Sequence, residues 1–444
     1  MRPPPARRLP RDSPAARLLK PETRVVDQPQ ARTTGESGLH ATPTKLPISR
    51  ALILVAVASL AAGLVAIAAA PAGAAVKRGP SGGGFYQAPK KLPNGHGKAI
   101  WQRQATKLTP IANAGINKTL LYTSRSPQGD RVVVSGSVSV PKGKAPAGGW
   151  PVISWAHGTT GAADSCAPTR IRPSSPAAPY VAYVHPQLED WIKAGYAVVA
   201  TDYQGLGTPG SHPYLVGKAE GRSVVDIVSA ARQLVPNLSR KYLIAGHSQG
   251  GQSALFAASL ASQWAPDLKL KGTVSYAPAS HLLEQAKLLP SLTTPSGLSA
   301  LAALILKGAS TVSKDVKTNK LLTPDARALF PETEQVCLPQ LAESDSFGGI
   351  APADLLQKNA DTSGLYDALD GMNPAVKIGP AVLLAQGTAD TTVFPFYTDL
   401  LNGELVDRGD DVDYKTYPGV NHGAIVAAAE DDALDFFEQR LPSK

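Results

Sequence analysis

Short apolar segments alternate with amphipathic segments from about residue 118 onward, and this alternation restricts the fold more than any other feature. Runs such as Pro151–Ala156 are bounded by turn residues and are too short for helices, so we expect strands there. The amphipathic segments have helical spacing, as Val225, Val228 and Ala231 illustrate. Strands separated by helices predict a mostly parallel sheet with both faces covered. The predicted strands are Leu120–Ser124, Arg131–Val140, Pro151–Ala156, Tyr196–Thr201, Lys241–Ala245, Gly272–Ala277, Pro380–Gln386 and Val412–Tyr417, and the predicted helices are Leu188–Ala194, Val224–Leu234, Gln249–Ser262 and Ala424–Arg440.

The alternation stops between Leu282 and Gly371, where the sequence is mostly helix-like and contains an apolar patch at Leu298–Leu306. It resumes with the last two predicted strands and the last helix. This interruption predicts a helical cap over the strand ends, inserted before the last two strands. We therefore expect a core formed by residues 118–280 and 376–444, with the cap at residues 281–375.

The first 117 residues precede this pattern. Residues 1–49 are rich in Pro, Arg, Ser and Thr, which predicts a disordered segment or a leader from a start site placed too far upstream. Lys45 and Arg50 stand before the apolar run Ala51–Ala70, which small residues follow. This order favours a signal peptide at 50–75 over a membrane anchor of similar length. Residues 76–117 are expected to be a linker and N-terminal segment, and the protein is expected to be secreted or associated with the cell surface.

The positive charge of the chain is concentrated in the leader. Residues 1–50 hold ten Lys and Arg against four Asp and Glu, so only +3 of the net +9 belongs to the rest. A nucleic-acid-binding protein would carry a basic face on its folded body. Nucleic acid is therefore not an expected partner.

The sequence GHSQG at residues 246–250 fits the pattern G-x-S-x-G. It follows the predicted strand Lys241–Ala245 and begins a predicted helix, the context that this motif requires. The turn is so sharp that a Cβ atom at the flanking glycines would clash with neighbouring elements, and the serine hydroxyl is exposed at the top of the sheet. Ser248 is therefore the predicted nucleophile.

A serine hydroxyl needs a base that accepts its proton, and only His281 and His422 follow Ser248 in the sequence. His422 lies in the loop between the last strand and the last helix, where a base reaches the serine. His281 opens the cap and is expected to be an ordinary loop residue. The expected order of serine, acid and histidine therefore favours His422.

The acid that orients the histidine is expected at the end of a neighbouring strand. Asp390 follows the predicted strand Pro380–Gln386 directly and is the predicted acid. The rival carboxylates lie in helical or loop sequence whose charge density is typical of a solvated surface. These rivals are Asp399, Asp407, Asp410 and Asp411.

The reaction also needs hydrogen-bond donors for the oxyanion of the tetrahedral intermediate. One is predicted to be the backbone N–H of Gln249, the residue after the nucleophile. The second is expected in the loop HGTTG at residues 157–161, from Thr159 or, as its nearest rival, Thr160. Asp202 follows the strand Tyr196–Thr201 and is expected to be structural.

The chain has two cysteines, Cys166 and Cys337. Two unrelated buried thiols would be expected in a cytosolic protein, whereas an even number in an exported chain favours a disulfide bridge.

Four segments, in this order, are HGTTG at 157–161, CAP at 166–168, ATDYQGLG at 200–207 and GHSQGG at 246–251. Together they resemble the secretory lipase family, the lipase A-like branch of the α/β hydrolases found in fungi and actinobacteria. The resemblance covers roughly residues 80–444. It implies an α/β-hydrolase fold with a helical cap, lipase or carboxylesterase activity on acylglycerols or simple esters, and a disulfide between Cys166 and Cys337. Family members often have a second bridge near the acid and the histidine, for which this chain has no cysteines.

The predicted reaction is therefore hydrolysis of an ester or acylglycerol through an acyl-serine intermediate, at a lipid interface where the substrate requires one. Acyl transfer to an alcohol or peptide cleavage would use the same residues. A non-catalytic surface-binding protein is a third alternative, against which the intact serine–acid–histidine order argues. The sequence has no Cys/His cluster and no glycine-rich phosphate loop with a lysine, so no metal and no cofactor are expected.

The apolar patch of the cap has two interpretations. Its side chains either pack against the core or line an acyl tunnel above Ser248. The tunnel interpretation predicts acyl contacts from Leu298, Leu301 and Leu304, with Ile305 beside them.

Overall fold

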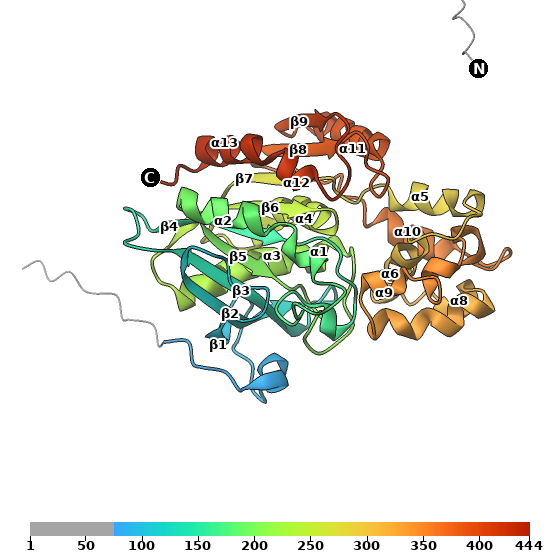
Figure 1. Cartoon of the computed structure of the whole chain (residues 1–444), viewed down its shortest axis with the longest axis horizontal. Coiled ribbons are helices and arrows are strands. Elements are labelled where there is room, and N and C mark those ends of the chain that lie inside the picture. The colour runs from blue at the N-terminus through green and yellow to red at the C-terminus, as the bar shows by residue number, and fades with distance from the viewer. Residues whose placement is uncertain (1–74) are drawn as a thin grey trace, which may run out of the picture. The chain divides into compact units, whose positions relative to one another are not determined.

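The buried β-rich segments of the chain pair into one nine-stranded sheet in the computed structural model, which describes residues 75–444 (Figure 1). The strands are β1 (Ala99–Gln104), β2 (Ala114–Arg125), β3 (Arg131–Pro141), β4 (Trp150–Ala156), β5 (Ala197–Thr201), β6 (Leu238–His247), β7 (Lys269–Tyr276), β8 (Val382–Gly387) and β9 (Val412–Tyr417). Their order is β1-β2-β3-β5-β4-β6-β7-β8-β9. The six strands from β5 to β9 in this order are parallel, whereas β1, β2 and β3 are antiparallel. The predicted mostly parallel sheet is confirmed.

The sheet begins earlier in the sequence than its pattern indicates. Residues 76–117 are expected to be a linker and N-terminal segment, and β1 lies within them and pairs with β2. All six residues of β1 are only half-buried or exposed, so this edge strand has no strong apolar alternation. The predicted leader at 1–49 and signal peptide at 50–75 lie outside the described residues, apart from Ala75.

Helices cover both faces of the sheet because side chains alternate between its faces. Ile244 of β6 packs in a cluster with α3 (Gly217–Leu234) and α4 (Gln249–Trp264), whereas Leu243 packs with α2 (His185–Ala194) and α13 (Glu430–Arg440). The last predicted helix is divided, since α12 (Ile425–Ala428) ends before α13 begins. The remaining core helices are α1 (Pro179–Ala182) and α11 (Pro395–Asp407). In residues 75–444, no helix is long and apolar enough to cross a membrane.

The interruption of the alternation is a helical cap, as predicted. Its helices are α5 (Leu282–Leu288), α6 (Leu298–Ser310), α7 (Thr318–Leu321), α8 (Pro324–Leu329), α9 (Leu338–Leu341) and α10 (Ser363–Asp370). The cap has a hydrophobic cluster of its own, with Leu304, Leu341 and Phe347 fully buried in it. Tyr214 and Leu215 of the core join this cluster, so the cap is anchored to the segment that leads into α3.

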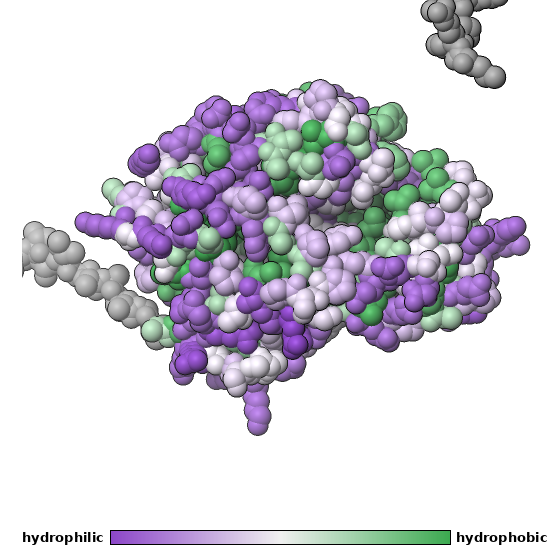
Figure 2. Space-filling model, viewed as in Figure 1, coloured by the Kyte–Doolittle hydropathy of each residue, from purple (hydrophilic) through white to green (hydrophobic). Residues whose placement is uncertain are grey.

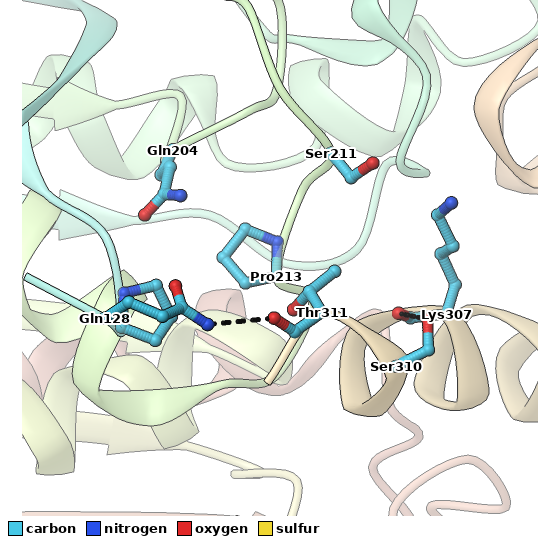
Figure 3. A pocket seen from close by; sticks show the side chains of 8 residues that line it. Gln128, Gln204, Ser211, Pro213, Lys307, Ser310 and Thr311 are labelled. Carbon is cyan, nitrogen blue, oxygen red and sulfur yellow. Dashed lines mark hydrogen bonds between the residues drawn. The ribbon is translucent and has the colours of Figure 1, made fainter. Parts of the chain in front are cut away.

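Polar contacts also join the cap to the core, around a small cavity of about 300 Å³ (Figure 3). Gln128, in the turn between β2 and β3, donates a hydrogen bond of 3.0 Å to the carbonyl oxygen of Thr311 at the end of α6. On the same helix Lys307 Nζ lies 2.9 Å from Glu334, which also accepts a hydrogen bond from Ser211. The C-terminal half of α6 is thereby held on the core.

The predicted disulfide between Cys166 and Cys337 is present and links the core to the cap, with both side chains buried. The backbone runs alongside it, since Leu338 N donates to Thr160 O at 2.9 Å. The bridge closes a loop of 171 residues, and cross-linking a loop of this size stabilises a fold by up to about 5 kcal/mol on the chain-entropy model.

Cys166→Ser with Cys337→Ser should therefore lower the free energy of unfolding by several kcal/mol. Denaturant titration measures the loss, and an unchanged midpoint would contradict it.

Asp202 is buried at the end of β5 and is a structural residue, as the sequence indicates. Its carboxylate accepts hydrogen bonds from Ser135 Oγ at 2.6 Å and from Thr169 N at 3.1 Å. Burial raises the pKa of Asp202 from 3.8 to about 6, although these hydrogen bonds oppose the shift.

This raised pKa predicts how stability depends on pH. Between about pH 4 and pH 6 the folded state retains a proton on Asp202 that the unfolded chain releases, so stability contributed by this proton is lost as the pH rises through 6. Relative to Asp202→Asn, the free energy of unfolding of the wild type should fall by roughly 3 kcal/mol between pH 4 and pH 7, at about 1.4 kcal/mol per pKa unit. Urea titrations at both pH values measure the difference, and an equal difference at the two would disprove the assignment.

Candidate active site

Ser248 lies at the sharp turn between β6 and α4. Its backbone angles are φ 59° and ψ −117°, a conformation that side-chain-bearing residues rarely adopt. The turn requires glycine on both sides: a Cβ atom on Gly246 would lie 2.1 Å from Gly250 O, and one on Gly250 would lie 1.9 Å from Ala156 O. The predicted strand–turn–helix context of the motif is therefore present, and it holds Ser248 at the ends of the parallel strands.

His422 and Asp390 form a hydrogen-bonded pair on loops that follow β9 and β8. His422 Nδ1 lies 2.7 Å from Asp390 Oδ2. The Asp390 side chain is fully buried, and its Oδ1 accepts from the backbone N–H groups of Thr392 at 2.8 Å and Val393 at 2.9 Å. These bonds leave the carboxylate no freedom to rotate away from the imidazole.

The rival residues have other partners. His281 stacks on Tyr397 and lies 3.4 Å from Glu404. Asp399 accepts a hydrogen bond of 2.6 Å from Tyr414. Asp410 was expected on a solvated surface, which is wrong: its side chain is buried and accepts from Ile378 N at 2.8 Å.

The loop HGTTG lies beside the serine, because a Cβ atom on Gly158 would lie 3.6 Å from Ser248 Cβ. Thr159 lines the same pocket as Ser248, and its Oγ1 lies 2.6 Å from the hydroxyl of Tyr214. Thr160 is instead fully buried, and its carbonyl accepts the bond from the cap residue Leu338. This placement supports Thr159 over Thr160 as the second oxyanion donor.

Sequence reasoning missed two residues that touch this site. The His247 ring packs on that of His422, with centroids 4.5 Å apart, and the Tyr183 hydroxyl lies 2.7 Å from His247 Nδ1. Burial lowers the pKa of His247 well below its usual value, and proximity to His422 adds to the shift. A neutral imidazole therefore flanks His422, the predicted base. His247 occupies a variable position of the motif, so only its place beside Ser248 could have drawn attention to it.

Ser248, His422 and Thr159 line a cavity of about 800 Å³ beneath the cap. The rest of its lining is mostly apolar, and Leu298 and Leu301 of α6 contribute to it. Leu304 does not, because it faces the interior of the cap and is fully buried there. Hydrophobic side chains gather where the cap meets the core (Figure 2). Four large ones at the mouth remain 38–52% exposed, namely Tyr180, Leu288, Leu292 and Phe394.

No group of three or more His, Cys, Asp or Glu residues that could hold a metal ion occurs within the described part of the chain. The site combines a serine, a hydrogen-bonded histidine and carboxylate, and a largely apolar cavity.

The mostly parallel sheet, the sharp turn between β6 and α4 that holds Ser248, and the inserted cap together define an α/β hydrolase. The family model described as secretory lipase matches residues 182–444, and the chain belongs to this family. The matched region contains Ser248, Asp390 and His422, whereas the resemblance in the sequence extends back to about residue 80. Lipase A of Moesziomyces aphidis is 27% identical over 225 residues, which are 48% of this chain and 47% of the relative. The match thus spans about half the length of that relative.

Two solved structures share the fold. Candida antarctica lipase A in its closed state aligns with a TM-score of 0.64 at 19% identity, over 80% of this chain and 85% of that one. The rice cell wall degrading esterase LipA from Xanthomonas oryzae, in a ligand-bound form, aligns with a TM-score of 0.63 at 18% identity, over 78% of this chain and 98% of that one.

Proposed function

We propose that the protein is an exported lipase or carboxylesterase that hydrolyses esters with apolar acyl chains through an acyl-serine intermediate. The observation that carries the proposal is that Ser248 and His422, the latter hydrogen-bonded to buried Asp390, line one large and mostly apolar cavity beneath the cap. Membership of the secretory lipase family supports both ester hydrolysis and export.

In the proposed reaction, Ser248 Oγ attacks the acyl carbon while His422 accepts the hydroxyl proton through Nε2. The carbonyl π electrons move to oxygen, and the oxyanion is held by the N–H groups of Gln249 and Thr159. The ester C–O bond then breaks, and the leaving alcohol takes the proton from His422. Water repeats the sequence on the acyl-serine, with His422 again as the base, and releases the carboxylic acid. Asp390 keeps the proton of neutral His422 on Nδ1 and stabilises the imidazolium.

Labelling with a fluorophosphonate and hydrolysis of p-nitrophenyl esters test the proposal together. We expect one label per chain and turnover of butyrate and longer esters without added metal. The exposed hydrophobic side chains at the mouth support delivery from a lipid surface, so turnover of tributyrin should increase above its solubility limit. Absence of both labelling and turnover would disprove the proposal, and faster transfer to an alcohol than to water would replace hydrolysis by acyl transfer.

The apolar cavity predicts a dependence on acyl length that Leu301→Asp should remove. Each methylene buried contributes about 0.8 kcal/mol, so kcat/KM should rise up to about fourfold per methylene from acetate to hexanoate. Leu301 lines the cavity and is half-buried, so a charge there opposes the acyl chain without unfolding the cap. Leu304 is unsuitable for this test, because a charge in the cap interior would destabilise it.

Ser310→Asp places the same charge on the same helix, outside the cavity, and is the matched control. Its chain-length profile should equal that of the wild type. If acetate is the best substrate, or if Leu301→Asp lowers all esters equally, the cavity does not bind the acyl chain.

A further inference from the structure

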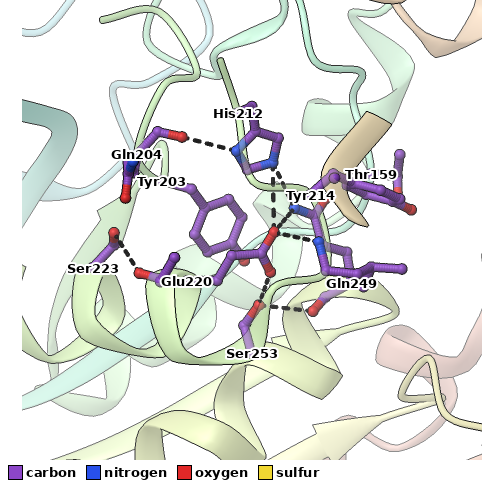
Figure 4. Close-up of polar contacts among 12 residues, drawn as sticks. Thr159, Tyr203, Gln204, His212, Tyr214, Glu220, Ser223, Gln249 and Ser253 are labelled. Carbon is purple, nitrogen blue, oxygen red and sulfur yellow. Dashed lines mark hydrogen bonds and ion pairs between the residues drawn. The ribbon is translucent and has the colours of Figure 1, made fainter. Parts of the chain in front are cut away.

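A buried cluster of polar side chains lies directly behind the two predicted oxyanion donors (Figure 4). At its centre is Glu220 of α3, which is fully buried. Glu220 Oε1 accepts from Gln249 Nε2 at 2.7 Å and from the backbone N–H of Leu215 at 2.9 Å, and Oε2 is hydrogen-bonded to Ser253 Oγ. Burying a carboxyl group costs free energy that an apolar side chain at this place would not, so these contacts call for an explanation.

Glu220 and His212 together orient the side chain of Gln249, the residue that follows Ser248. His212 Nδ1 lies 2.9 Å from the carbonyl oxygen of Gln204, so Nδ1 carries the proton and Nε2 accepts. Gln249 Nε2 lies 3.0 Å from that acceptor. The two amide hydrogens of Gln249 therefore go to His212 and Glu220, and the opposite amide orientation would face two acceptors with an oxygen. Burial lowers the pKa of His212 to about 4, which keeps the ring neutral.

The contact of Glu220 with the backbone N–H of Leu215 acts on the Thr159 side of the predicted oxyanion hole. Leu215 has a φ of 58°, a left-handed conformation that is unfavourable for a leucine, and its N–H is held by Glu220. The adjacent Tyr214 contacts Thr159 Oγ1 through its hydroxyl. The Tyr214 backbone is also packed against the cap, since a Cβ atom on Gly308 would lie 2.0 Å from its carbonyl oxygen. One carboxyl group thus holds both the Gln249 side and, through residues 214–215, the Thr159 side.

We propose that Glu220 is a positioning residue that sets the separation of the two oxyanion-hole donors, Gln249 and Thr159. The proposal rests on the proposed ester hydrolysis. It requires that loss of the Glu220 contacts weakens binding of the tetrahedral oxyanion more than binding of the ground-state ester.

Glu220→Ala tests this requirement, and Asp226→Ala is its matched control. Asp226 lies on the same helix and is equally buried, but it bonds Ser124, His96 and Trp264 instead of the site. An alkyl trifluoromethyl ketone, which a serine nucleophile converts to an oxyanion, is the probe. In Glu220→Ala we expect kcat to fall ten- to a hundredfold, the inhibition constant of the ketone to rise by a similar factor, and KM to change less than threefold. In Asp226→Ala, kcat, KM and the inhibition constant of the ketone should each stay within threefold of the wild type.

Glu220→Gln should restore most of the activity, because an amide can accept from Leu215 and Gln249 and donate to Ser253. Ser253→Ala removes the contact with Glu220, together with a 2.9 Å hydrogen bond from Ser253 Oγ to Gln249 O, with little change in volume, and it should raise the inhibition constant three- to tenfold. It decides the question if Glu220→Ala does not fold. An inhibition constant that is unchanged in Ser253→Ala, or that rises as much in Asp226→Ala as in Glu220→Ala, overturns the role of Glu220. A wild type that is neither labelled by fluorophosphonate nor active on esters overturns the proposed function, and this role with it.

Discussion

Replacing Ser248 by Ala should lower kcat on p-nitrophenyl butyrate by about 10⁴- to 10⁶-fold while leaving the fold intact. Loss of the nucleophile removes the covalent path, and enzymes with a serine, histidine and acid lose activity on this scale when one member is deleted. The side chain is small and sits on a turn whose shape is set by Gly246 and Gly250, so alanine fits the same backbone. Circular dichroism and thermal unfolding should match the wild type.

Ser296→Ala provides the control for this loss. Ser296 also lines the cavity, but it belongs to the cap and not to the turn that holds Ser248. Its kcat should stay within about twofold of the wild type, and fluorophosphonate labelling should persist in Ser296→Ala and disappear in Ser248→Ala. Activity of Ser248→Ala within tenfold of the wild type would refute the assignment of the nucleophile.

The sequence predicted the parallel strands of the sheet more accurately than the antiparallel edge strand β1. Strand β9 has the predicted bounds, and β4 differs by a single residue, because turn residues flank short runs of strand-forming side chains there. Strand β1 was not predicted, since its side chains alternate too weakly to give a signal. Period and turn chemistry are local properties, whereas β1 is stabilised by its pairing with β2.

The candidate site likewise contains residues whose positions the sequence predicts and residues whose positions depend on tertiary packing. Ser248, Asp390 and His422 follow strands, and the ends of parallel strands meet at one edge, so their proximity could be predicted. The polar cluster around Glu220 could not, because its partners come from α3, α4 and the segment before α3. Helical spacing likewise identified an apolar face on α6 but could not separate Leu301, which faces a cavity, from Leu304, which faces the cap interior.

The chain has no cysteines for a second disulfide near Asp390 and His422, but hydrogen bonds join the two loops that hold these residues. Its loop and the His422 loop are joined by backbone hydrogen bonds, from Thr388 N to Tyr417 O and from Ala389 N to Val420 O, each 3.0 Å long. Thr388 Oγ1 also accepts from Gly419 N at 2.9 Å. The predicted acid and the predicted base are therefore connected by several hydrogen bonds between neighbouring loops, which supports a fixed Asp390–His422 geometry without a covalent link.

Asp390→Asn should lower kcat by about 10⁴-fold, because it moves the ring proton of neutral His422 from Nδ1 to Nε2. All four partners of the Asp390 carboxylate are donors: Thr392 N and Val393 N at Oδ1, and His422 Nδ1 and Gln386 Nε2 at Oδ2. An asparagine NH₂ group cannot face the two backbone donors, so it must take the Oδ2 position. His422 Nδ1 then becomes the acceptor and the ring proton moves to Nε2, where it prevents His422 from accepting the proton of Ser248.

The control for this change is Asp399→Asn. Asp399 contacts the Tyr414 hydroxyl at the surface and has no contact with His422. Its kcat on p-nitrophenyl butyrate should stay within about twofold of the wild type. Because the Asp390→Asn side chain has nearly the same shape as the aspartate, its KM should change little while kcat collapses. An Asp390→Asn enzyme within tenfold of the wild type would show that His422 is oriented by another group, and equal losses in both variants would show a general effect of removing a negative charge.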